Sequence, residues 1–99
     1  MTAHSSRQGK VFVVVAYDIP DDRRRTRVHK KLKSFGTAVQ YSVFEAILDH
    51  AGLAKMEKMI RTEIKGEDSV RLYSLCRQCQ RRIIAIHGAV TEDAQTIVV

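Results

Sequence analysis

The hydrophobic positions at the start of the chain predict a buried strand followed by an amphipathic helix. Residues 11–17, VFVVVAY, form an unbroken and largely β-branched apolar run, which is typical of a strand buried on both faces and is too short to span a membrane. Pro20 ends this strand, and Asp21 or Asp22 can cap the helix that follows. The helix is expected to continue to about Phe35, because apolar residues recur at helical spacing in its later turns: Val28, Leu32 and Phe35.

The rest of the pattern predicts two paired strands, a second helix and a fourth strand. Gly36 is expected to cap the first helix, and residues 37–48 then have the β-branched and aromatic density of paired strands, with a turn near residues 40–42. Residues 49–52 open a helix with one apolar stripe: Leu53, Met56, Ile60 and Ile64. Residues 69–75 alternate as a strand does. The order βαββαβ predicts an α+β, ferredoxin-like fold, in which two helices cover one face of an antiparallel four-stranded sheet.

Segments outside these six elements predict the domain limits and an assembly. Residues 83–86 read as an extra short strand without a local partner, which suggests pairing with a second chain in a homodimer. We therefore expect a loose N-terminal tail at 1–9, a folded domain at 10–87, and a C-terminal tail at 88–99 that docks on the domain or on the partner chain. Because residues 1–9 have no apolar core, a signal peptide is not expected, and the predicted location is cytoplasmic, without membrane attachment.

The charge of the chain favours a polyanionic partner. Lys and Arg number 17 against 11 Asp and Glu, for a net charge of +6. Seven of the 17 basic residues lie between Arg23 and Lys33, and a second group follows at Arg71, Arg77, Arg81 and Arg82. Within the first helix, Arg25 extends the apolar stripe backward, so it should point toward the sheet end near Asp18. The others, including Arg24 and Arg27, are placed for phosphate or solvent, and an ordinary solvated helix face remains the alternative.

The one charge that ends the buried first strand, Asp18, is the main candidate for chemistry. A single carboxylate is a poor Mg²⁺ site, but a twofold axis would bring a second copy of it, and a cation between the two would relieve their repulsion. In the alternative, Asp18 only caps a turn or pairs with Arg25. Cys76 and Cys79 have the spacing of half a zinc site or a redox pair, yet no second pair follows, so two reduced loop cysteines are favoured. His29 is expected to be exposed.

Four segments together resemble the Cas two family of CRISPR-associated proteins. They are Tyr17-Asp18-Ile19, the arginines leading into Arg27-Val28, the run QYSVFE at residues 40–45, and DSVRLY at residues 68–73. The resemblance implies a ferredoxin-like homodimer in which the two Asp18 side chains face each other and hold Mg²⁺ or Mn²⁺. It also implies a metal-dependent endonuclease of the CRISPR adaptation complex, acting on single-stranded RNA or double-stranded DNA and assembling with the CRISPR integrase subunit.

Residue roles follow from that resemblance and from the positions described above. Asp18 is expected to be the catalytic and metal-binding residue, one from each protomer. The expected nucleic-acid contacts are Tyr17, Arg24, Arg25, Arg27 and Phe44. For Phe44 the alternative is a core aromatic in a paired strand. For the whole protein the alternative is a non-catalytic architectural subunit that bridges DNA and the integrase with the same basic residues.

Overall fold

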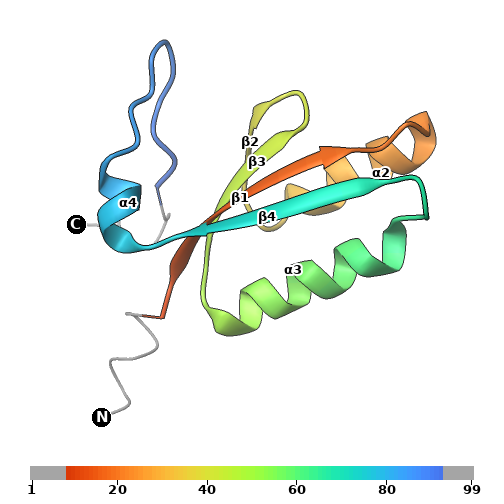
Figure 1. Ribbon diagram of the computed structural model, residues 1–99, viewed down its shortest axis with the longest axis horizontal. Coiled ribbons are helices and arrows are strands. Elements are labelled where there is room, and N and C mark those ends of the chain that lie inside the picture. The colour runs from red at the N-terminus through yellow and green to blue at the C-terminus, as the bar shows by residue number, and fades with distance from the viewer. Residues whose placement is uncertain (1–8, 93–99) are drawn as a thin grey trace.

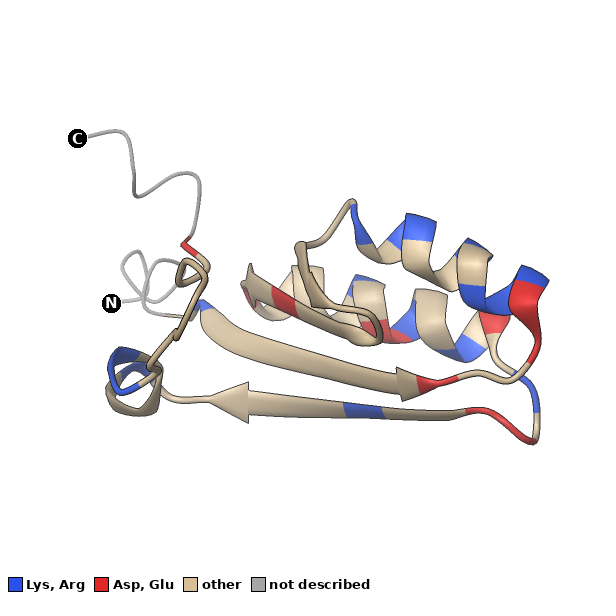
Figure 2. Ribbon diagram, turned by 90° about the horizontal axis from the view of Figure 1, so that it is seen from above, with Lys and Arg blue, Asp and Glu red and all other residues tan. Residues whose placement is uncertain are grey.

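The fold is an antiparallel four-stranded sheet with two helices on one face, as the sequence predicts (Figures 1 and 2). The computed structural model describes residues 9–92, so most of the predicted N-terminal tail and the end of the C-terminal tail lie outside it. Along the chain the elements are β1 (Val11–Asp18), α2 (Asp22–Leu32), β2 (Thr37–Gln40), β3 (Val43–Leu48), α3 (His50–Glu63), β4 (Ser69–Leu75) and α4 (Arg77–Arg81). The strand order is β2-β3-β1-β4, which confirms the ferredoxin-like arrangement.

The core lies between β1 and the two long helices. From β1, Val13 and Val15 are fully buried and Tyr17 is 5% exposed. They pack with residues from three other elements: Val28 and Leu32 of α2, Phe44 of β3, and Met56 and Ile60 of α3. The expectation that β1 is buried on both faces is wrong in part. Val14 and Ala16 are only half-buried, because the two long helices both lie on the other face of the sheet (Figure 2). Phe12, on the same face as Val14 at the end of β1 near α4, is fully buried.

Both long helices begin at aspartates that cap them, and the first ends earlier than predicted. Asp21 accepts a hydrogen bond from the Arg23 amide at 3.2 Å, and Asp49 accepts one from the Gly52 amide at 2.8 Å. Helix α2 ends at Leu32, with Lys33 as its C-cap, and the chain then turns through Phe35. The aspartate hydrogen bonds satisfy backbone N–H donors that the start of a helix leaves unpaired.

Gly36 is needed for a close approach and not as a left-handed cap. None of the described glycines has a positive φ. A Cβ at Gly36 would lie 2.3 Å from the Glu45 carbonyl oxygen and 2.7 Å from the Ala46 Cβ. The link between α2 and β2 therefore lies directly against β3.

The segment after β4 differs most from the prediction. Residues expected to form a polar loop make the short helix α4, which follows β4 and lies close to β1. Residues 83–86 form no strand in the described chain, and Ile84 and Ile86 are 82% and 80% exposed. The chain then returns to the sheet, where the Thr91 hydroxyl donates to Glu45 Oε1 at 2.6 Å. Pairing of residues 83–86 with a second chain stays a prediction. Among residues 9–92, no helix is long and apolar enough to cross a membrane.

Candidate metal and nucleic-acid site

Asp18 is the last residue of β1 and is exposed, while its backbone is held in the ladder opposite Ser69 of β4. Its carboxylate has no hydrogen-bond or ion-pair partner among residues 9–92. Since side chains alternate along a strand, Asp18 lies on the face opposite Tyr17, which is the face that the helices leave uncovered. The alternative in which Asp18 pairs with Arg25 or caps a turn is therefore wrong.

Arg25 holds the turn that follows Asp18. Its Nη1 donates to the Ile19 carbonyl at 2.9 Å and approaches the Pro20 carbonyl at 3.4 Å, and its Nη2 donates to Asp22. The hydrogen bond to Asp22 raises the pKa of the guanidinium. Arg25 thus points toward the sheet end, as predicted, but it fixes the backbone beside Asp18 and does not contact the Asp18 carboxylate.

Arg24 is a buried structural residue, which corrects its predicted place at solvent or phosphate. Its guanidinium makes a bidentate pair with Asp68, with Nε to Oδ2 at 2.6 Å and Nη2 to Oδ1 at 3.0 Å. The side chains are 10% and 0% exposed, respectively. Hydrogen bonds from Arg24 lower the pKa of the Asp68 carboxyl, and the Lys65 amide adds to this effect. The pair joins the start of α2 to the residue before β4, and Arg24 Nη1 also donates to Asp21 Oδ2 at 3.3 Å. Buried and held by these two carboxylates, Arg24 is not presented to a phosphate.

Arg27 is half-exposed but is also paired. Its Nε donates to Glu63 Oε1 at 2.7 Å, and Lys31 donates to the other oxygen of the same carboxylate. The hydrogen bonds from Lys31 and, second, from Arg27 lower the pKa of Glu63. The same two contacts join α2 to α3. Other basic residues on α2 and its C-cap have no side-chain partner within residues 9–92: Arg23, Lys30 and Lys33. Lys and Arg lie along the length of α2 (Figure 2).

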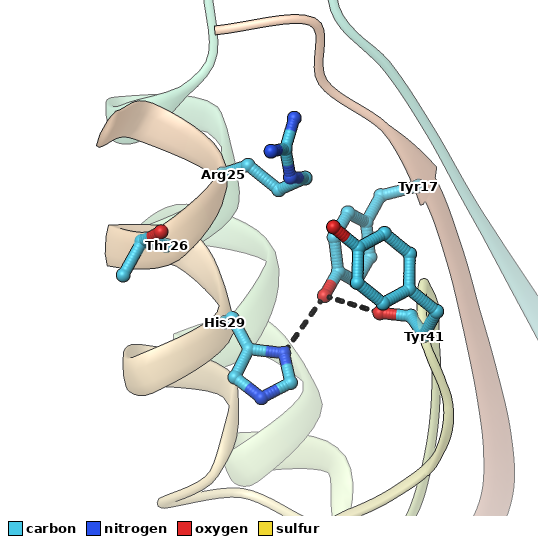
Figure 3. Close-up of a pocket in the computed structure, with 5 residues that line it drawn as sticks. All are labelled: Tyr17, Arg25, Thr26, His29 and Tyr41. Atoms are coloured by element: carbon cyan, nitrogen blue, oxygen red, sulfur yellow. Dashed lines mark hydrogen bonds between the residues drawn. The ribbon is translucent and has the colours of Figure 1, made fainter. Parts of the chain in front are cut away.

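A pocket of about 280 Å³ lies between α2 and the turn that joins β2 to β3 (Figure 3). Its lining residues are Tyr17, Arg25, Thr26, His29 and Tyr41. The Tyr17 hydroxyl is hydrogen-bonded to His29 Nδ1 at 3.0 Å and lies 3.5 Å from the Tyr41 carbonyl. Burial raises the pKa of Tyr17, while the charge of Arg25 opposes this shift. The pocket opens on the helix side of β1, so it does not include Asp18.

Sequence reasoning missed three residues of this pocket: Thr26, His29 and Tyr41. His29, predicted to be exposed, is half-buried, with its ring 5.0 Å from the Phe44 ring and nearly perpendicular to it. His29 lies four residues after Arg25, so the two side chains share one helix face. That spacing was the sequence signal that could have placed His29 beside Arg25. Tyr41 is 80% exposed at the tip of the β2–β3 turn. Nothing local distinguished it from the core aromatics beside it.

The two aromatics expected to contact nucleic acid lie in the core. Phe44 is 1% exposed and Tyr17 is 5% exposed, and their ring centroids are 6.3 Å apart. Neither ring can stack on a base without opening the core, so these two contacts are corrected. For Phe44 the alternative, a core aromatic of a paired strand, is confirmed. Only the edge of Tyr17 that carries the hydroxyl reaches the pocket.

The family model described as CRISPR associated protein Cas2 matches residues 11–83, which include every element from β1 to α4. The chain belongs to the Cas2 family. A Cas2 protein named as an endoribonuclease, from Chloroflexus aurantiacus, is 48% identical over 85% of this chain and 92% of its own length. One named as an endonuclease, from Thermus thermophilus, is 42% identical over 73% of this chain and 81% of its own.

A solved structure gives the same fold. The crystal structure of a hypothetical protein from Thermus thermophilus aligns with a TM-score of 0.71 at 37% identity. The alignment covers 85% of this chain and all of the other. The Cas2 resemblance stated on four sequence segments is thereby confirmed, and the names of the relatives point to a nuclease.

Proposed function

We propose that this protein is a divalent-metal-dependent endonuclease of the CRISPR adaptation complex, with a site shared by two Asp18 residues. The observation that carries the proposal is the exposed and unpartnered carboxylate at the end of a central strand. Mg²⁺ and Mn²⁺ are held in such sites by one or two carboxylates with water in the remaining positions. The oxygen donors of Asp18 fit such a cation.

A homodimer is part of the proposal, because one chain offers too few ligands. Among residues 9–92 no group of three or more His, Cys, Asp or Glu side chains could hold a metal ion. Asp18 lies on the uncovered face of the sheet, where a second copy could bring its own Asp18. The exposed side chains of Ile84 and Ile86 give that second copy a further apolar contact.

The chain itself contributes position and positive charge. The β1–β4 ladder fixes the Asp18 backbone, and Arg25 fixes the following turn through the Ile19 carbonyl. Arg23 and Lys30, which are exposed and unpaired in the described chain, can neutralise backbone phosphates without reading sequence. A bound divalent cation supplies an activated water and a counter-charge for the phosphate.

RNA and DNA are both retained as substrates. Phosphate contacts are common to both, and the two relatives carry the names endoribonuclease and endonuclease. Assembly with the CRISPR integrase is proposed for the same dimer. In the second candidate function the dimer only bridges DNA and the integrase, and the basic residues of α2 favour that role equally.

The test is cleavage and binding of an RNA and DNA panel by wild type, Asp18→Asn and the control Glu57→Gln. Glu57 is a half-exposed carboxylate on α3, and within residues 9–92 it pairs only with Arg61. Asp18→Asn should lose about a hundredfold or more in cleavage rate, because it removes the charge that holds the cation, and should keep its affinity for nucleic acid. Chelation of divalent ions should act on the wild type in the same way, and Glu57→Gln should cleave normally.

Light scattering on the same preparations should give the mass of a dimer. Full cleavage by Asp18→Asn would show that the site lies elsewhere, and a monomer at micromolar concentration would exclude the shared site. A wild type that cuts nothing with Mg²⁺ or Mn²⁺ but still bridges DNA and the integrase would favour the architectural role.

A further inference from the structure

Two thiols lie side by side at the start of α4, at the opposite end of the β1–β4 ladder from Asp18. Phe12 pairs with Leu75 at this end, and Asp18 pairs with Ser69 at the other. Cys76 is the N-cap of α4, and its Sγ accepts a hydrogen bond from the Cys79 amide at 3.5 Å. Both cysteines are exposed and free. The two-residue spacing is that of a dithiol able to close a disulfide within one helical turn.

The two thiols are not equivalent. Hydrogen bonds from the Cys79 amide and from the Cys79 thiol lower the pKa of Cys76. The same contact raises the pKa of Cys79. Cys76 therefore has the larger thiolate fraction near neutral pH, and the thiolate is the form that attacks a disulfide. This asymmetry assigns Cys76 the attacking role and Cys79 the resolving role.

A metal site is less well supported at this position. Structural zinc takes four ligands, and the described chain has no group of three potential ligands that includes these cysteines. Arg77 lies between the two thiols in sequence, and Arg81 and Arg82 follow. Arginine side chains are not zinc ligands, so these neighbours do not complete a metal site.

We propose that Cys76 and Cys79 are a redox-active pair that forms a reversible disulfide within one chain by exchange with a low-molecular-weight disulfide such as oxidised glutathione. The Cys76 thiolate attacks one glutathione sulfur, forms a mixed disulfide and releases one glutathione thiolate. Cys79, after losing its proton, attacks Cys76 Sγ and releases the second. Two cysteine thiols are oxidised, one glutathione disulfide is reduced to two thiols, and the two cysteine protons pass to the released thiolates.

The site is independent of the proposed nuclease function. The cysteine pair does not involve Asp18 or the basic face of α2. It lies directly after β4, at the start of α4. In Figure 1, α4 lies at the end of β4, before the segment that extends away from the sheet. A disulfide there fixes the first turn of α4, from which the exposed Ile84 and Ile86 follow.

The experiment uses the full chain, metal-free, in buffers of set reduced and oxidised glutathione, with alkylation of remaining thiols and intact mass measurement. The variants are Cys76→Ser, Cys79→Ser and the double serine variant as a control. Serine is a good N-cap, so Cys76→Ser should keep α4. Each wild-type chain should lose the mass of two hydrogens and resist alkylation, without a disulfide link to a second chain. Reduced thiol should restore the original mass and the alkylation. Cys79→Ser should gain one glutathione several-fold faster than Cys76→Ser.

Three results would overturn the proposal. The first is alkylation of both wild-type thiols at every glutathione ratio, and the second is a disulfide that forms only between chains. The third is stoichiometric zinc in the purified protein that protects both thiols. Equal adduct rates in the two single variants would overturn the assignment of Cys76 as the attacking thiol.

Discussion

Asp18 and Asp68 lie at the same end of the paired strands β1 and β4, since Asp18 is opposite Ser69 in the ladder. Their surroundings differ in every other respect. The Asp68 side chain is fully buried, accepts two hydrogen bonds from Arg24 and accepts a third from the Lys65 amide. Asp18 is exposed and has no partner in the described chain. A carboxylate whose lone pairs are already used stabilises the fold, whereas one held in place without donors can accept a cation.

The neighbouring arginines repeat this contrast. Arg24 donates hydrogen bonds to Asp68, while Arg25 donates hydrogen bonds within the turn after β1. Neither is a free surface charge, although both are part of the cluster RRR at residues 23–25. Within that cluster, only Arg23 keeps its guanidinium without a partner in the described residues. Net charge alone thus overstates the number of cations that this helix can offer to a phosphate.

The largest effect should come from exchanging the two aspartates for asparagine and measuring stability. Asp68→Asn removes the closest and most buried carboxylate beside the Arg24 guanidinium and leaves only the longer contacts to Asp21 and Glu67, so the melting temperature should fall by several degrees or more. Asp18→Asn removes an exposed and unpaired charge, and its melting temperature should stay within about 2 °C of wild type. Thermal unfolding followed by circular dichroism at neutral pH measures both. If the two variants lost equal stability, the structural contrast between the aspartates would be wrong.

A smaller effect should appear in the pH dependence of stability. The pKa of Asp68 is lowered in the folded state by Arg24, so between its folded value and the ordinary value near 3.9 the unfolded chain binds more protons. The stabilisation of the folded state that comes from the Asp68 carboxylate is fully present above the ordinary carboxylate pKa. It is lost as the pH falls toward the pKa of Asp68 in the folded protein. Melting temperature measured from about pH 7 to about pH 3 should therefore drop more steeply for wild type and Asp18→Asn than for Asp68→Asn. Parallel curves for all three would contradict the assignment.

The smallest effect concerns the salt dependence of nucleic-acid binding. Arg23→Ala and Lys30→Ala should each reduce the slope of log affinity against log salt by about one unit, if each contacts one phosphate. Arg61→Ala is the matched control, because Arg61 is exposed on α3 and pairs with Glu57. Neither α2 variant should change the melting temperature. A slope that is unchanged in both α2 variants would show that the basic face of α2 is ordinary solvated surface.

Most of the fold could be predicted because its signals are local. The β-branched run of β1, the apolar stripes of the helices and the aspartate before α3 depend on neighbours within a few residues. Helix α4 was missed because it has five residues, is capped by a cysteine and buries none of its side chains. The uncovered face of β1 was missed for another reason. An apolar run shows that a strand is hydrophobic. It does not show whether the chain has enough helices to cover both faces of the sheet.

The site was predictable only where its signal was local. Asp18 is marked by its place at the end of an apolar run, and that placement is confirmed. The helical spacing placed Arg25 correctly, but the burial of Arg24 could not be predicted, because its partner Asp68 lies 44 residues further along the chain. Whether a given arginine in such a run meets a carboxylate or water is decided by packing between elements. The Tyr17–His29 contact depends on packing in the same way.

Gly36 limits how this chain can change over generations. Any other amino acid there would place its Cβ where the Glu45 carbonyl oxygen and the Ala46 side chain already lie. Gly66 and Gly88 have nothing within 4 Å of the same position, so substitutions there meet no steric barrier. Sterics therefore leave room for a larger residue at two of these glycines, while a change at the third requires β3 to move. Because the turn after β2 and the Tyr41 wall of the pocket are attached to β3, such a change would reshape the pocket together with the sheet.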